Sequence, residues 1–420
     1  MSINPFELKP MELENCFTER KDLYGYSYDK YNADPYTKLR IILMNGTEFE
    51  QVGFGHNVMR NEARGDLRRD LALLRRSEQM QQKRIACLKP ISESVLENTI
   101  AYEQLAVDLT ALMASREQNP YVKHCLDFAL LEDFDHLYRY ADLMNMETGE
   151  KAEDLVGGYT EIMPGRPTIS EHRHPYDDVK RPIDSKKDSL LTKLQVNIIT
   201  AAEQQTMNYY MNQCGFYKSD LGRRLYQEIA MIEEQHVSQY GSLIDPMCSP
   251  LEKLLMHEYT EAYLYYSCYE SETDAKVKKI WEDFFLQEVA HLHYAAELLK
   301  KYDGKEYREV IPDPVFPELL KLSEQKDYVR GVLKNTVTET GMREDFVKLD
   351  ALSDSFDFFD YQKRVNGSAT GVASHEVIER HIKELGEDYR YQKKDHPVIA
   401  LRKRDEDNYV LGRVKGKVGI

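Results

Sequence analysis

The chain has 420 residues, of which 72 are acidic and 56 are basic, so its formal net charge is −16. A negative balance of this size argues against nucleic acid as a partner, because phosphate backbones attract basic surfaces. No apolar run reaches the length that crosses a bilayer, and residues 1–30 contain no apolar stretch of a signal peptide. We therefore expect no membrane contact and a cytoplasmic location.

The six cysteines are scattered along the chain without a CxxC pair. This usage predicts reduced thiols and excludes a zinc or iron–sulfur knuckle built on cysteine pairs. Any metal must therefore be bound by Glu, Asp and His.

In chain order, residues 1–36 are rich in Tyr, Asp, Asn and Pro and predict an extended arm. Apolar residues at spacings of three and four then predict eight long helices in four hairpins, an all-α fold. Their expected ranges are 37–60, 66–86, 93–117, 121–146, 189–213, 220–243, 251–270 and 275–301. The segment 147–188 is a long connection. The tail, 302–420, is expected to hold one or two short helices, including Ser374–Leu385, and a basic extended stretch over 401–417.

Three of the predicted helices carry a carboxylate followed three residues later by a histidine, so both side chains share a helix face. A glutamate lies 30 residues before each carboxylate, which is the spacing that brings two antiparallel helices level. The three sets are Glu103 with Asp133 and His136, Glu203 with Glu233 and His236, and Glu258 with Glu288 and His291. Burying such carboxylates on apolar stripes costs several kcal/mol unless a cation binds them. The pattern therefore predicts metal ligands.

A shift of the chain on itself by 155 residues indicates an internal duplication. The shift aligns Glu103 with Glu258, Asp133 with Glu288, His136 with His291, Glu48 with Glu203, Glu78 with Glu233 and Gln81 with His236. The first two-hairpin repeat is then 37–146 and the second is 189–301. Gln81 stands where the second repeat has a histidine, so we expect the site that uses Glu48 and Glu78 to bind one metal weakly.

A Glu followed by Glu-xx-His, twice over on four helices, resembles the ferritin-like di-iron carboxylate superfamily across residues 37–301. The spacing Glu258-xx-Glu261 is in addition similar to rubrerythrin, where it implies an alternative carboxylate ligand. The resemblance implies ferritin-like four-helix bundles and a two-metal site of iron, or alternatively manganese. The implied ligands are Glu48, Glu78, Glu103, Asp133, His136, Glu203, Glu233, His236, Glu258, Glu261, Glu288 and His291. Unlike rubrerythrin, the chain has no rubredoxin-type Cys pairs, so a separate electron donor is implied.

Two arrangements of the hairpins remain open. Only the 147–188 connection is long enough for a crossover along a bundle, which favours pairing hairpin two with hairpin three and hairpin four with hairpin one. The unaltered ligand sets of hairpins three and four favour pairing those two instead.

The resemblance implies an oxidoreductase, peroxidase-like or oxygenase-like, that acts with O₂, peroxide or a small organic substrate. Two alternatives stay open: non-enzymatic iron binding or storage, and a scaffold whose sites have partly decayed, as Gln81 and Asp133 suggest. A homodimer is compatible with each of these functions.

The remaining histidines and several tyrosines have simpler interpretations. His56 is expected to be a core histidine, whereas His172, His174, His375 and His381 are expected to face solvent. Four tyrosines lie one or two turns from predicted ligands, and we interpret them as packing residues in preference to ligand partners or electron carriers: Tyr140, Tyr210, Tyr240 and Tyr265.

Overall fold

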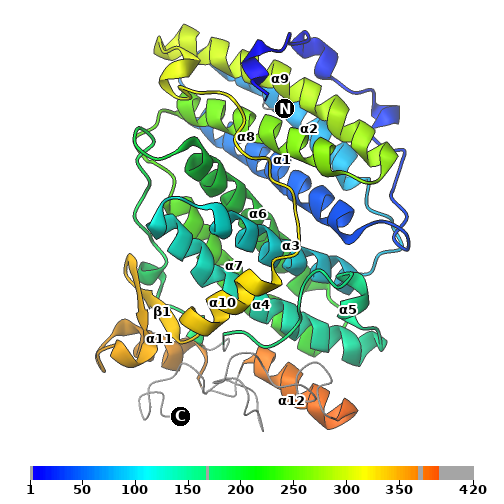
Figure 1. Cartoon of the computed structure of the whole chain (residues 1–420), viewed down its shortest axis with the longest axis vertical. Coiled ribbons are helices and arrows are strands. Elements are labelled where there is room, and N and C mark those ends of the chain that lie inside the picture. Colours follow the sequence, from blue (N-terminus) through cyan, green and yellow to red (C-terminus); the bar gives the residue numbers. More distant parts are fainter. Residues whose placement is uncertain (1–2, 167–169, 368–371, 387–420) are drawn as a thin grey trace. The chain divides into compact units, whose positions relative to one another are not determined.

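The structure is a computed structural model that describes residues 3–166, 170–367 and 372–386. It is mostly helical, and all eight predicted long helices are present (Figure 1). They are α1 (Pro35–Asn61), α2 (Gly65–Ala86), α3 (Val95–Arg116), α4 (Pro120–Thr148), α6 (Leu190–Phe216), α7 (Asp220–Ser242), α8 (Pro250–Ser271) and α9 (Ala275–Asp303). None of these or the other described helices combines the length and the apolarity needed to cross a membrane.

The ends of the long helices follow local capping rules. Ser94 and Ser249 each form a capping box at the start of α3 and α8. The helices α4 and α9 end at Gly149 and Gly304, whose φ angles of 74° and 69° are left-handed and suit a residue without Cβ. These signals explain why the helix boundaries can be derived from the sequence.

The chain divides into two compact units, and one of the boundaries between them falls within α6. Unit 1 comprises Met1–Glu93, Ile183–Gln205 and Ile244–Leu322, and unit 2 comprises Ser94–Pro182, Thr206–Leu243 and Ser323–Ile420. Each unit takes segments from both sequence repeats, so the compact units differ from the repeats 37–146 and 189–301. Hairpins one and four lie together in unit 1, as the crossover arrangement requires.

Within unit 1, α1 packs against α2 and α8, and α9 packs against α8 and α2 (Figure 1). The N-terminal arm belongs to this unit and contains three short 3-10 helices: η1 (Pro5–Glu7), η2 (Leu13–Cys16) and η3 (Arg20–Asp22). The first two of them pack against α9. The arm thus contains short helical turns instead of being extended throughout, which the aperiodic sequence does not predict.

Within unit 2, α4 is the central helix and packs against α3, α7, α10 (Lys326–Thr336) and α12 (Ala373–Leu385). The tail also forms a hairpin of β1 (Glu339–Met342) and β2 (Asp345–Lys348), with Met342 paired to Asp345, and the helix α11 (Asp357–Val365). Of these elements only α12 is predicted. The hairpin turns at Arg343, which adopts φ 55° without a glycine, so it has no turn signal in the sequence.

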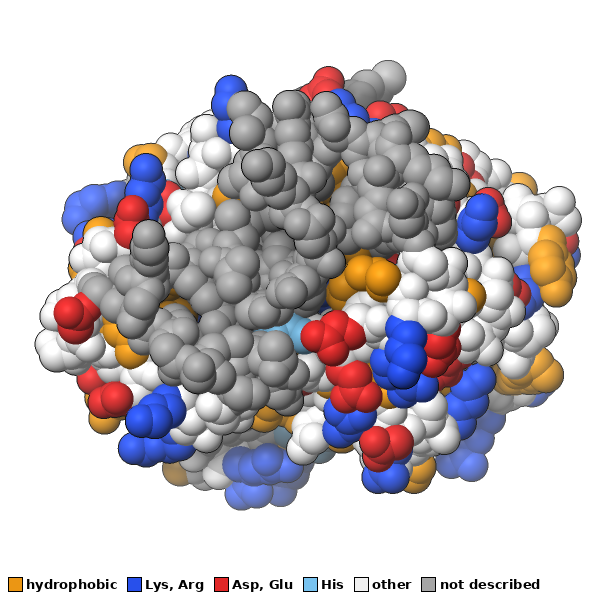
Figure 2. Space-filling view, turned by 90° about the horizontal axis from the view of Figure 1, so that it is seen from below, with side chains coloured by type: hydrophobic (Ala, Val, Ile, Leu, Met, Phe, Trp, Pro, Cys, Tyr) orange, Lys and Arg blue, Asp and Glu red, His pale blue; other side chains and the backbone are white. Residues whose placement is uncertain are grey.

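The expectation that His375 and His381 face solvent is wrong, because both are buried where α12 packs on α4 and α7. His172 and His174 are half-buried. The predicted stretch 401–417 lies outside the described residues. On the face of the molecule seen in Figure 2, described acidic and basic side chains are interspersed.

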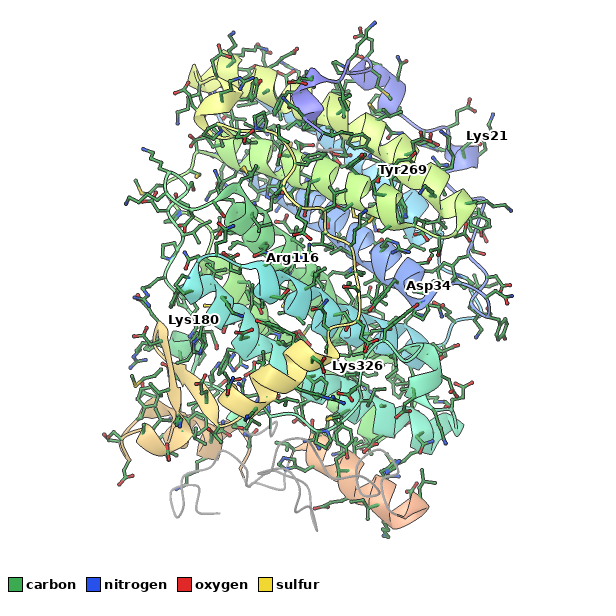
Figure 3. The ribbon with its side chains drawn as sticks, viewed as in Figure 1. Lys21, Asp34, Arg116, Lys180, Tyr269 and Lys326 are labelled. Carbon is green, nitrogen blue, oxygen red and sulfur yellow. The ribbon has the colours of Figure 1, made fainter. Side chains whose placement is uncertain are left out.

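The long connection contains α5 (Ala152–Leu155) and η5 (Pro175–Asp177). Near its end, the Lys180 ammonium group donates to the carbonyl oxygens of Asp177 at 2.7 Å and Arg343 at 3.0 Å (Figure 3). Burial lowers the pKa of Lys180 to about 8. These bonds hold the connection against the β hairpin, and Arg166, Glu171 and Arg173 lie close to α4, as described below.

Candidate metal centres

Unit 1 contains a cluster of five carboxylates and one histidine, contributed by four helices. Each of the six side chains is fully buried: Glu48 on α1, Glu78 on α2, Glu258 and Glu261 on α8, and Glu288 and His291 on α9. We call these residues the unit 1 cluster. Buried carboxylates at this density require cations or protons to balance their charge.

The donor atoms of the unit 1 cluster form two groups that share Glu78. Glu78, Glu258, Glu288 and His291 present one donor atom each within 4.8 Å of one another, and Glu48, Glu78 and Glu261 do the same. His291 Nδ1 lies 2.9 Å from Glu78 Oε1 and 3.1 Å from Glu288 Oε1. Two adjacent donor groups with a common carboxylate suit a pair of ions.

The hydrogen bonding of the cluster carboxylates supports the binding of a pair of metal ions. Among the described residues, neither carboxylate oxygen of Glu261 has a hydrogen-bond donor, and Oε2 of Glu48 and of Glu288 also have none. Burial raises the pKa of Glu261 well above its usual range, and the neighbouring Glu78 and Glu48 raise it further. Two divalent cations would neutralise four of the five carboxylates and supply the missing partners. The residues therefore fit a metal pair.

Three polar side chains complete the surroundings of the unit 1 cluster. Gln81 Nε2 donates to Glu288 Oε1 at 2.7 Å, Gln51 donates to Glu258, and the Tyr265 hydroxyl donates to Glu48. Gln81 thus occupies the position that a histidine has in the second repeat, as the sequence alignment indicates. His56 is half-buried on α1 and is in neither donor group.

Unit 2 contains a second cluster, formed by Glu103 on α3, Asp133 and His136 on α4, and Glu233 and His236 on α7. All five are fully buried. We call these residues the unit 2 cluster.

The two histidines of the unit 2 cluster share Glu233. His136 Nδ1 lies 3.0 Å from Glu233 Oε1, and His236 Nδ1 lies 3.2 Å from Glu233 Oε2. His236 Nδ1 is also 3.3 Å from Asp133 Oδ1. Glu103, Asp133, His136 and Glu233 present donor atoms within 4.8 Å of one another.

The predicted ligand Glu203 is buried on α6, in the part of that helix that belongs to unit 1. On its own helix it lies seven residues, or two turns, before Tyr210 and therefore on the same face. Its assignment to the unit 2 cluster stays a prediction from the motif.

The Nε2 nitrogen of His236 contacts a buried carboxylate that is not part of the unit 2 cluster. His236 Nε2 lies 2.7 Å from Glu132 Oε2, and Glu132 Oε1 accepts from Arg166 at 2.9 Å and from Arg173 at 2.5 Å. Burial alone would raise the pKa of Glu132, but the two arginines and His236 hold it well below its usual range. Glu132 therefore stays ionised and accepts a hydrogen bond from Nε2–H of His236, so that Nδ1 carries the lone pair and faces the carboxylates of the unit 2 cluster, where a metal would bind.

The other histidine of unit 2 has a similar outer partner. His136 Nε2 lies 3.4 Å from Glu171 Oε2. Arg166, Glu171 and Arg173 all come from the long connection, so this segment forms the outer layer of the unit 2 cluster. A crossover between hairpins two and three accounts for the length of the connection, but it does not account for the buried charges of Arg166, Glu171 and Arg173.

In unit 1 the corresponding outer partner is neutral. His291 Nε2 lies 3.0 Å from the hydroxyl of Ser77, which donates to the Cys16 carbonyl at 3.5 Å. Ser77 precedes the motif carboxylate Glu78 just as Glu132 precedes Asp133, so in each unit the residue before a motif carboxylate contacts the histidine of the other hairpin. The two clusters differ in the charge of this partner.

Sequence reasoning misses these outer residues and misjudges two tyrosines. The missed residues are Gln51, Ser77, Glu132, Arg166, Glu171 and Arg173. A polar residue directly before the motif carboxylate is a usable signal for Ser77 and Glu132, whereas the connection has no periodicity that would reveal its three residues. Tyr210 donates to Glu103 at 2.6 Å and Tyr265 donates to Glu48, so these two phenols do more than pack.

Comparison with known proteins gives no assignment: no family model matches the chain, and neither a curated protein nor a solved structure matches it.

Proposed function

We propose that the chain is a ferritin-like dinuclear metal protein that binds iron, with manganese as the alternative, and acts as an oxidoreductase on O₂ or peroxide. The observation that carries the proposal is the presence, in each unit, of buried carboxylate and imidazole donor atoms that lie within 4.8 Å of one another, arranged in unit 1 as two groups that share Glu78. Exposed acidic residues need no cation. Buried carboxylate oxygens that accept no hydrogen bond need a cation or a proton to balance their charge. A pair of such ions supplies one-electron chemistry at adjacent positions, which suits reduction of O₂ or peroxide.

In unit 2 the proposed ligands are Glu103, Asp133, His136, Glu203, Glu233 and His236, with Glu203 assigned by the sequence motif. The chain itself contributes orientation and proton control. Glu132 fixes the His236 ring, and Tyr210 holds a proton beside Glu103. The full burial of the cluster keeps bulk water away from the donors. Electrons would come from a separate donor, because the chain has no cysteine pairs for a second redox centre.

A second function is proposed for unit 1. Its ligands are the unit 1 cluster residues, and the group of Glu48, Glu78 and Glu261 contains oxygen donors only. Oxygen-only sites favour hard cations and bind a transition metal less selectively than sites with imidazole. Unit 1 is therefore the better candidate for non-enzymatic iron binding.

Metal analysis of histidine variants tests the proposal. His136→Ala and His236→Ala should each remove metal from unit 2 and leave the unit 1 metals in place, whereas His291→Ala should do the reverse. The matched control is His257→Ala, because His257 precedes the ligand Glu258 but its Nδ1 pairs with Glu50 at 3.2 Å. Metal counts by elemental analysis, with anomalous diffraction at the iron and manganese edges to identify and locate the ions, give the result. Unchanged counts in all three variants, or zinc as the only metal, would overturn the proposal.

A further inference from the structure

Four tyrosine rings form a continuous path in unit 2, from the metal-ligand candidate Glu103 to the protein surface. The Tyr210 ring lies 5.3 Å from Tyr140 and 5.6 Å from Tyr226, and Tyr140 and Tyr226 are 4.9 Å apart between ring centres. Tyr226 in turn lies 5.0 Å from Tyr217. We call Tyr210, Tyr140, Tyr226 and Tyr217 the tyrosine path.

Both ends of the path hydrogen-bond to a carboxylate. The Tyr210 hydroxyl donates to Glu103 at 2.6 Å, and the Tyr217 hydroxyl donates to Glu147 at 2.7 Å. A phenol can lose an electron at moderate potential only if its proton leaves at the same time, so a carboxylate in hydrogen-bond contact is the partner that oxidation needs. The two terminal tyrosines have this partner.

The middle of the path is buried and shows no such proton acceptor. The Tyr226 hydroxyl lies 2.7 Å from Thr99 Oγ1, which donates to the Val95 carbonyl, so Tyr226 is the donor in that pair. The Tyr140 hydroxyl is fully buried and has no hydrogen-bond partner among the described residues. Leaving a buried hydroxyl without a hydrogen bond is unfavourable, and a phenylalanine at this position would avoid that cost. Packing alone therefore does not explain this tyrosine.

The outer end of the path reaches a surface hollow. Glu147, which accepts from Tyr217, lines a cavity of about 670 Å³ together with Lys218 and Ser219. The Lys218 side chain is 70% exposed, so protons and small reductants can reach this end. A side branch through Tyr209, stacked on Tyr102 at 4.5 Å, ends at the Val95 carbonyl, which cannot accept a proton.

Among the described residues of unit 1, no chain of tyrosine rings leads from the corresponding phenol, Tyr265, to the surface. Tyr265 follows Glu258 by seven residues, as Tyr210 follows Glu203, and it also donates to a cluster glutamate. Its ring contacts are Trp281 at 6.0 Å and Phe284 at 5.5 Å. The tyrosine path is therefore a feature of unit 2 and not a general result of packing tyrosines beside a cluster.

We propose that the tyrosine path carries single electrons from a reductant at the Glu147 hollow to the unit 2 cluster. The proposal rests on the proposed function, with peroxide as the oxidant. In each transfer, Tyr210 gives one electron to peroxide bound at the unit 2 cluster and gives its phenolic proton to Glu103. An electron from Tyr217 then reduces the Tyr210 radical, Glu103 returns the proton, and Tyr217 passes its own proton to Glu147. A one-electron reductant such as ascorbate restores Tyr217. Two transfers, with two protons from solvent, convert one peroxide molecule into two water molecules.

The first test uses the metal-loaded, reduced full chain. Mixing with peroxide in the absence of reductant should give a tyrosyl radical in the electron paramagnetic resonance spectrum, and ascorbate should remove it. Tyr210→Phe should abolish this radical, and Tyr226→Phe or Tyr217→Phe should slow its removal by ascorbate. Tyr138→Phe is the matched control, because Tyr138 is equally buried on α4 but outside the path. Path variants that bind metal normally and behave like Tyr138→Phe would overturn the proposal.

The second test does not depend on metal. Cys214 is half-buried on α6, three residues before Tyr217, and can carry a ruthenium photo-oxidant once Cys87 and Cys248 are replaced by serine. In the metal-free chain, a flash should create a tyrosyl radical at Tyr217 that moves inward along the path, and ascorbate should reduce this inner radical more slowly than a radical that stays at Tyr217. With Tyr226→Phe the radical should stay at Tyr217 and be reduced faster. Equal lifetimes in both chains would overturn the path, whereas unequal lifetimes in a chain that binds no metal would reject only the proposed function.

Discussion

His236 Nε2 and Glu132 Oε2 are 2.7 Å apart in the interior of unit 2, and two arginines hold the carboxylate in its ionised form. The ring nitrogen that faces the unit 2 cluster is therefore an electron-rich donor. In unit 1 the Nε2 nitrogen of the cluster histidine, His291, contacts the Ser77 hydroxyl, which is a much weaker proton acceptor than a carboxylate. The two clusters are expected to differ in metal affinity for this reason.

Glu132→Gln should weaken metal binding at the unit 2 cluster by roughly 10-fold to 100-fold, because the outer partner of a ligand histidine tunes its basicity. Binding at unit 1 should not change. Competition titrations with a chelator, read by elemental analysis, measure both affinities. The control is Glu234→Gln, an exposed neighbour of the ligand Glu233 on α7. A loss of the same size in the control, or none in Glu132→Gln, would contradict this interpretation.

Gln81→His should strengthen binding of the weaker metal of unit 1. The substitution places an imidazole where Gln81 now donates to Glu288, and imidazole is a stronger ligand for iron and manganese than an amide. In a metal titration, the two ions of the pair should then bind at similar metal concentrations. Gln82→His serves as the control, since Gln82 donates to Asn45 and not to a cluster carboxylate. Equal effects of the two substitutions would count against the assignment of Gln81.

The long helices and the inner donors could be derived from the sequence because both follow regular spacing. The three-residue and 30-residue intervals of Glu258, Glu288 and His291 are properties of helices with short links, and the structure brings these residues into one cluster. The 155-residue shift likewise marks Gln81 as the altered position, where the structure has an amide bonded to Glu288.

The outer layer of unit 2 could not be derived in this way. Arg166 and Glu171 belong to an irregular connection, whose contacts depend on tertiary packing and not on a helical period. The burial of His375 was missed for a similar reason, since α12 buries it against helices distant in sequence. The β hairpin at Arg343 lacks the Asn-Gly signal that would have predicted it.

Glu261→Gln should have opposite effects on the metal-free and metal-loaded chain. Without metal, it removes one of five buried acids and should raise the free energy of unfolding by about 1–3 kcal/mol, because burying this acid at neutral pH costs either charge repulsion or the uptake of a proton. With metal, it removes a ligand and should lower the metal affinity of unit 1. Thermal unfolding with and without chelator measures both effects. Glu270→Gln, an exposed change on the same helix, should alter neither. A change of the same sign in both states would argue against a metal role for Glu261.

Glu272 provides a pH-dependent prediction away from either cluster. Its carboxylate accepts from Arg40 Nε at 2.9 Å, from the Thr37 hydroxyl at 2.6 Å and from Trp281 Nε1 at 3.0 Å. Burial by itself raises the pKa of Glu272, but these hydrogen bonds and the charge of Arg40 outweigh it and lower the pKa below its usual value. Because the folded pKa is the lower one, the stabilisation is fully present above the unfolded value of about 4.3 and is lost as the pH falls through the folded value.

Glu272→Gln should therefore lower the free energy of unfolding at pH 7 by about 3 kcal/mol, since it leaves the Arg40 charge buried without its partner. The difference from the unaltered chain should start to shrink at about pH 4.3, where the glutamate of the unfolded chain takes up its proton, and should disappear as the pH falls through the lower pKa of the folded chain. Urea unfolding of both chains at a series of pH values measures this difference in the free energy of unfolding. Glu282→Gln removes an ion pair of the exposed Lys279 and should change stability little at any pH. A difference between Glu272→Gln and the unaltered chain that stays constant down to pH 3 would show that the carboxylate charge is not what stabilises this contact.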